Sequence, residues 1–147
     1  MQSSLVEDIL SPSLAGDEMQ RNMDLIRELL LKLEALPMRP GEIMSITPDA
    51  EEVAVPGYNP DQIDYHLSQI SKAGLIDEAG ARPMIGIGFR CLTPAGHDFL
   101  DSIRDPETWA KTKKLAEGAG GFTIAILKDL ANGLIKTQIE RLTGIKL

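Results

Sequence analysis

The sequence has only one cysteine, no long apolar run and a shortage of basic residues, and each lack excludes a class of protein. One cysteine cannot form an internal disulfide bond, which argues against a disulfide-stabilised secreted scaffold and fits a reducing cytoplasm. No apolar run approaches the roughly 18 residues of a membrane-spanning helix, and the first residues lack the basic start of a signal peptide. We therefore predict a cytoplasmic protein without an integral membrane segment.

Basic residues are outnumbered, since 15 lysines and arginines face 22 aspartates and glutamates, a net charge of −7. The imbalance is uneven, because residues 1–105 hold 8 basic and 18 acidic residues, whereas residues 106–147 hold 7 and 4. Phosphate binding needs several cations that release counterions, so the acidic part disfavours DNA as a partner. The basic C-terminal part could dock on an acidic surface of its own or a neighbouring subunit, but two differently solvated surfaces explain the asymmetry more simply.

Motifs for catalysis and cofactor binding are also missing. The sequence has no Gly-x-Ser-x-Gly elbow, no phosphate-binding loop and no clustered metal ligands. Gly86 and Gly88 lack the third glycine of a dinucleotide fingerprint. His97 shares a helical face with Asp101 and Arg104, which favours a structural hydrogen-bonded pair over a general base because no nucleophile accompanies it. We predict no enzymatic activity, no catalytic residue, no cofactor and no metal.

What the sequence does contain is helical periodicity interrupted by short extended runs. Met23 to Leu36 repeats apolar residues at three- and four-residue intervals, which predicts a core helix that ends before Pro37. Glu42 to Pro56 mixes β-branched and apolar residues with prolines and carboxylates. We interpret this second stretch as two short strands joined by an acidic turn.

Gly57 to Leu100 predicts a helix, a two-stranded ribbon and a second helix in succession. Pro60 to Ala73 has apolar residues on one helical face, and Gly74 suits the left-handed end of that helix. Thr93 and Pro94 provide an N-cap oxygen and a proline for the first turn of the following helix. A helix, a hairpin and a further helix in this order are typical of a winged helix.

The ribbon is predicted from Leu75 and Ile76, which start one strand, and from Met84 to Leu92, where apolar residues alternate with small or charged ones. This alternation places Cys91 on the inward face with Ile85, Ile87 and Phe89, so we predict a buried structural thiol. The predicted fold class is α+β, a winged-helix-like domain at residues 19–105. An N-terminal arm precedes it at residues 1–18, where Ser4 and Glu7 are spaced as a capping box.

Residues 106–147 are predicted to form a C-terminal helical extension. Its first helix starts by N-cap logic at Asp105, and Gly118 to Gly121 form a hinge before a second, amphipathic helix. That helix could pack on its own domain, pair with the same helix of a second subunit, or lie on an anionic membrane surface. The candidate oligomerisation residues are Ile124, Leu127, Leu130, Leu134, Ile135, Ile139 and Leu142.

The solvent face of the helix predicted at residues 60–73 is the candidate contact surface for DNA or another partner. Asp61 and Asp64 on that helix argue against DNA, and the preceding residues contain no readable short helix of the kind a helix-turn-helix needs. His66 borders the core face, which indicates a satisfied core histidine more than a ligand or a base. The candidate contact residues are Gln62, Tyr65, Gln69, Lys72 and Arg82.

Several peptides together resemble a known family. They are Met23 to Arg27, Tyr65 to Leu67, Ala73 to Ile76, the distinctive Leu92 to Asp105, and Trp109 to Lys113, with Ala110 in place of an expected Asn. Across about residues 19 to 147 the chain resembles the phage- and prophage-associated family named domain of unknown function 2513. That resemblance implies a winged-helix-like fold and a mobile-element setting, and it implies no particular activity.

We expect a non-enzymatic protein-interaction or assembly module of a phage-related or phage-defence system. We expect it to bind a protein partner or itself, as a homo-oligomer formed through the C-terminal helix. A winged-helix DNA-binding regulator is the alternative, supported by Gln62, Gln69, Lys72 and Arg82. A membrane-active effector that uses the C-terminal amphipathic helix is a weaker alternative.

Overall fold

The computed structural model describes residues 19–147, so the predicted arm with its capping box lies outside the described residues. The described chain forms two compact units that divide between Thr93 and Pro94. The sequence pattern put the domain boundary between residues 105 and 106. The units divide earlier because α4 (Pro94–Ile103), which we had assigned to the first domain, packs on the two helices that follow it.

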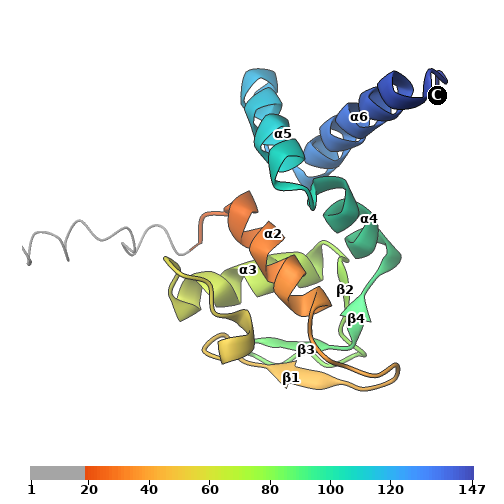
Figure 1. Cartoon of the computed structure of the whole chain (residues 1–147). Coiled ribbons are helices and arrows are strands. Elements are labelled where there is room, and N and C mark those ends of the chain that lie inside the picture. The colour runs from red at the N-terminus through yellow and green to blue at the C-terminus, as the bar shows by residue number, and fades with distance from the viewer. Residues whose placement is uncertain (1–18) are drawn as a thin grey trace, which may run out of the picture. The chain divides into compact units, whose positions relative to one another are not determined.

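The first unit contains two long helices, one short 3-10 helix and four short strands (Figure 1). The strands pair as two separate antiparallel ladders, β1 with β3 and β2 with β4. The elements are α2 (Met23–Glu34), β1 (Met44–Ile46), η2 (Glu51–Val53), α3 (Pro60–Lys72), β2 (Ile76–Asp77), β3 (Ile87–Phe89) and β4 (Cys91–Leu92).

Both predicted helices of the first unit are confirmed, and side chains cap them where the sequence places suitable residues. Asn22 caps α2 by accepting a hydrogen bond from the backbone N–H of Leu25. Asn59 and Gln62 form a reciprocal capping box at the start of α3. The two helices pack on each other through apolar faces that form the core. Its fully buried side chains include Leu25, Ile26, Leu29, Leu30, Leu67 and Ile70.

The prediction of two strands between Glu42 and Pro56 is half wrong. β1 is present, but the second strand is replaced by η2, in which the N–H groups of Val53 and Ala54 bond to carbonyls three residues earlier. These local bonds satisfy the backbone without a ladder partner. Val53 is nevertheless fully buried. It belongs to the core, but its backbone is 3-10 helical instead of extended.

The predicted hairpin is confirmed in part, because β2 pairs with β4 at the end of the predicted second strand, whereas β3 pairs with β1. The strand expected from Met84 to Leu92 is interrupted at Arg90 and divides into β3 and β4. The interruption shifts the inward alternation by one residue, because a strand alternates with period two. Leu92 is therefore buried and Cys91 is exposed, so the predicted buried thiol is wrong. Ile85 precedes β3 and is 61% exposed.

The second unit consists of α4, α5 (Pro106–Ala119) and α6 (Ile124–Thr143). Asp105 caps α5 as predicted, and Thr123 caps α6. The predicted glycine hinge is a turn at the end of α5, where Gly120 adopts φ +86°, a conformation that L side chains rarely adopt. α5 and α6 form a helical hairpin that packs on α4.

The described chain is therefore a mixed α+β protein with five α-helices, two small antiparallel sheets and a long C-terminal helix. Across residues 19–147, no helix is both long enough and apolar enough to cross a lipid bilayer.

Candidate partner-binding groove

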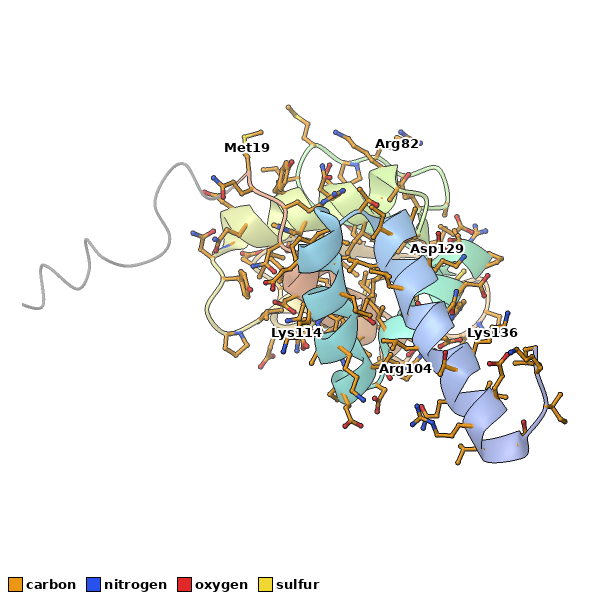
Figure 2. All side chains as sticks on the ribbon, turned by 90° about the horizontal axis from the view of Figure 1, so that it is seen from above. Met19, Arg82, Arg104, Lys114, Asp129 and Lys136 are labelled. Carbon is orange, nitrogen blue, oxygen red and sulfur yellow. The ribbon has the colours of Figure 1, made fainter. Side chains whose placement is uncertain are left out.

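A groove with a volume of about 590 Å³ lies between the solvent face of α3 and the loop that joins β2 to β3. We call it the α3 groove. Arg82 of the loop and Met19, both labelled in Figure 2, line it beside α3. Its other lining residues include Asp61, Asp64, Tyr65 and Lys72 on α3, and Glu78 and Met84 on the loop side.

The loop is fixed to α3 at one point. The carboxylate of Asp64 accepts a hydrogen bond of 2.8 Å from the backbone N–H of Gly86. Gly86 has φ +81°, and a Cβ atom there would collide with the backbone of Ile46, so only glycine fits between α3 and β1. Asp64 therefore shapes the groove instead of projecting freely into it.

The groove is more acidic than basic. Asp61, Asp64 and Glu78 line it together with only two cations, Lys72 and Arg82. Arg82 is already paired, because its Nε lies 3.5 Å from a carboxylate oxygen of Glu78. That pair is exposed on the Arg82 side and contributes little to stability.

The structure brings together three of the five predicted contact residues. Tyr65, Lys72 and Arg82 all line the α3 groove. Gln62 is engaged elsewhere, since its side-chain oxygen accepts from the N–H of Asn59 in the capping box. Gln69 lies outside the lining of the groove.

Apart from Arg82, sequence reasoning missed the loop side of the groove. Met84 is fully exposed and Glu78 faces the groove, although neither belongs to α3. Helical periodicity identifies the outward face of α3, but it carries no information on which loop residues fold back beside it. The usable signal in the sequence was the glycine at position 86, because a residue without a Cβ atom permits the close approach to the Ile46 backbone that the structure shows.

His66 is the core histidine that the sequence predicted, and its side chain is 1% exposed. Its Nε2 accepts from the backbone N–H of Asn22 at 2.8 Å, so Nδ1 carries the proton and donates to the carbonyl of Gln62 at 2.7 Å. Burial lowers the pKa of His66 below its usual value of 6.5, the bond to Gln62 opposes this shift, and the charge of Arg21 adds to it. The neutral ring joins α3 to the start of α2.

The second histidine, His97, lies one helical turn before Asp101 on α4. The carboxylate of Asp101 accepts from Arg104 at 2.7 Å, one helical turn along. His97 is exposed on α4.

The seven residues of the predicted oligomerisation stripe differ in exposure, with one buried, four partly exposed and two exposed. Leu127 is fully buried, whereas Ile139 is 40% and Leu142 is 76% exposed. The other four members, Ile124, Leu130, Leu134 and Ile135, are partly exposed. The first half of α6 therefore belongs to the core of the second unit, and its last turns leave an apolar surface open.

Comparisons with known proteins place this chain in a family. The model of a family described as "Hypothetical protein (DUF2513)" matches residues 20–122, which include the α3 groove except Met19 and end just before α6. A protein of Haemophilus influenzae, described as an uncharacterized protein, is 30% identical over 124 residues, covering 82% of this chain and 99% of the relative. No solved structure matches the chain. The chain belongs to the DUF2513 family.

Proposed function

We propose that this protein is a non-enzymatic interaction and assembly module that binds a protein segment in the α3 groove and associates with itself through α6. The first unit works as a winged-helix-like scaffold, in which α3 and the loop after β2 present the groove. The partner segment carries basic and apolar side chains. We include a phage-related or phage-defence setting in the proposal, and that part rests on family resemblance alone.

The charge of the α3 groove is the observation that carries the proposal. A helix that binds DNA faces phosphates and needs several cations, but here Asp61, Asp64 and Glu78 outnumber Lys72 and Arg82. The described part of the first unit, residues 19–93, likewise holds 11 acidic and 7 basic residues. This surface repels a polyanion and attracts a cationic segment.

The shape of the α3 groove supports a peptide-sized partner. Tyr65 and Met84 provide apolar surface in a groove that carboxylates also line, and the Met84 side chain is fully exposed. Exposed aromatic and methionine side chains are enriched in the cores of protein interfaces, where they anchor a partner. A segment with a lysine or arginine beside an apolar residue satisfies both features.

Site-specific photo-crosslinking in cells tests this proposal. A photoreactive amino acid replaces Tyr65 in one variant and Ala54, an exposed residue outside the groove, in the control. We expect one discrete protein adduct from the Tyr65 position that is absent from the control and is lost when Asp61→Lys is added. Equal adducts at both positions, or adducts to nucleic acid, would contradict the proposal.

DNA binding is the alternative, and one observation favours it, since Lys72 and Arg82 line the same groove. Fluorescence anisotropy of duplex DNA, titrated with protein between about 50 and 200 mM salt, separates the two functions because phosphate contacts weaken steeply over that range. We expect no salt-sensitive binding. Salt-sensitive binding that disappears in the Lys72→Glu, Arg82→Glu variant would make the protein a DNA-binding regulator.

A further inference from the structure

The end of α6 has no covering helix within the second unit. α6 has 20 residues and α5 has 14, so at 1.5 Å per residue α6 is about 30 Å long and exceeds α5 by about 9 Å. Figure 2 shows the two helices side by side near their joining turn and diverging towards the end of α6, beyond Lys136. Apolar side chains occupy that end: Ile139 (40% exposed), Leu142 (76%), Ile145 (62%) and Leu147 (58%).

The end of α6 is an ordered surface. Gly144 ends the helix with φ +76°, and its N–H donates to the carbonyl of Glu140. The side-chain carboxylate of Glu140 then accepts from the backbone N–H of Leu147 at 2.8 Å. Residues 144–147 are therefore held against the last turn of α6 and present their apolar side chains as part of it.

A hollow of about 490 Å³ lies where α6 diverges from the first turn of α5, and we call it the α6 groove. One wall comes from α6, where the apolar residues Leu134, Ile135 and Leu142 line the groove beside Thr137, Gln138 and Arg141. The opposite wall, at the corner between α4 and α5, carries three carboxylates, those of Asp101, Asp105 and Glu107, and one cation, Lys111. The opposite wall is therefore acidic on balance and suits an apolar segment that carries a cation.

The chain itself contains such a segment. Lys146 lies among the exposed apolar residues that follow α6. Arg141 already lines the α6 groove of its own chain, so Lys146 is the cation of this segment that can complement the carboxylates of a second copy's groove. The same helix cannot fill its own groove, because α6 runs without a break to Thr143 and forms one of the groove walls.

We infer that the end of α6, residues 139–147, fills the α6 groove of a second copy of this chain, and that the exchange is reciprocal. Leu142 belongs both to the inserted segment, residues 139–147, and to the lining of the α6 groove. These two surfaces are therefore neighbours on each copy of the chain. Adjoining surfaces of this kind close around a two-fold axis and give a dimer instead of an open fibre. The inference rests on the self-association in the proposed function and adds its geometry.

Analytical ultracentrifugation of the full chain, across a hundredfold range of concentration, measures the dimer dissociation constant. We expect Leu142→Glu to raise this constant at least about tenfold, because a carboxylate would be desolvated at the centre of the interface. The control is Ile43→Glu on the first unit, where Ile43 is 55% exposed, and it should leave the constant unchanged. Circular dichroism verifies that both variants are folded.

A charge exchange tests the acidic wall separately. Glu107→Lys and Lys146→Glu should each weaken the dimer, and the double variant should recover most of the loss because the two charges have exchanged places across the interface. Recovery in the double variant requires that the two side chains meet in the dimer. Independent, additive losses would overturn the reciprocal geometry.

The remaining outcomes separate this inference from the proposed function. A dimer that survives both Leu142→Glu and the charge exchange overturns the reciprocal exchange and leaves self-association standing. A wild-type chain that stays monomeric overturns both, and its binding to vesicles of anionic lipid would show that a membrane covers the end of α6 instead. Photo-crosslinking at Tyr65 reports on the α3 groove independently of all these results.

Discussion

Thr112 offers a direct test of the packing around α5. Its side chain is fully buried, and its hydroxyl oxygen has no hydrogen-bond partner among the described residues. Desolvating a hydroxyl without a partner costs roughly 1–3 kcal/mol in folded proteins. Thr112→Val replaces the hydroxyl with a methyl group of nearly the same shape, and both residues have similar helix propensities. We therefore expect the free energy of unfolding to rise by about 1–2 kcal/mol.

The assay can be confined to the second unit. Trp109 is the only tryptophan in the sequence, lies on α5 one turn before Thr112, and is 5% exposed. Its fluorescence during urea unfolding follows the second unit even when the first unfolds separately. In a unit this small, a gain of 1 kcal/mol also raises the melting temperature by roughly 4 °C or more.

Two further variants isolate the cause of the effect. Thr112→Ser keeps the hydroxyl and removes the methyl group, so it should destabilise the unit by about 1 kcal/mol. Thr137→Val makes the same chemical change on the exposed surface of α6 and should stay within about 0.5 kcal/mol of the wild type. If Thr112→Val destabilises the unit while Thr137→Val behaves as expected, the hydroxyl makes a hydrogen bond and the reasoning is wrong.

Three further predictions concern the first unit. Because burial lowers the pKa of His66 below 6.5, the unfolded state binds more protons, so the free energy of unfolding is highest above pH 6.5 and falls as the pH drops through the folded pKa. Urea titrations from pH 8 to 5 test this, and His66→Gln should flatten the profile. Gly86→Ala should lower the free energy of unfolding by about 3 kcal/mol or more, because the added Cβ atom would collide with β1. Gly57→Ala, in open space at φ +91°, should lower it by only about 1 kcal/mol. Equal losses of stability would contradict the close approach of Gly86 to β1. Cys91 should react with a maleimide in the native protein at nearly the rate of a free thiol. Labelling that occurs only after unfolding would show that the thiol is buried, as the sequence predicted.

The helices could be predicted because their information is local. Asn59, Pro60 and Gly74 bracket α3 by capping rules that act within a few residues, and its core face follows from periodicity. The strands could not be predicted as well, because their partners are distant. β2 precedes β3 in the chain, which suggests that these two strands form a hairpin. β3 pairs with β1 instead, and only the three-dimensional packing decides between these two pairings.

Cys91 shows how one local break defeats a correct pattern. The alternation from Ile87 to Phe89 is real and both side chains are buried, but Arg90 ends the strand and changes which residues face inward. The α3 side of the groove could be predicted, because helical periodicity identifies the outward face of α3. The other side depends on a loop that Asp64 holds through Gly86, which is a contact between residues 22 positions apart.

The pairing of β1 with β3 also sets the order in which the molecule is expected to fold. It closes a loop of about 40 residues, from Ile46 to Ile87, and the entropy of that closure is lost before the core of the first unit can form. The second unit contains only helices joined by short turns, and contacts of such low sequence separation form quickly. The second unit should therefore fold first in refolding experiments, although it follows the first during synthesis. Until its own core forms, the newly synthesised first unit exposes unpaired strands. At this stage the protein should be most prone to aggregate.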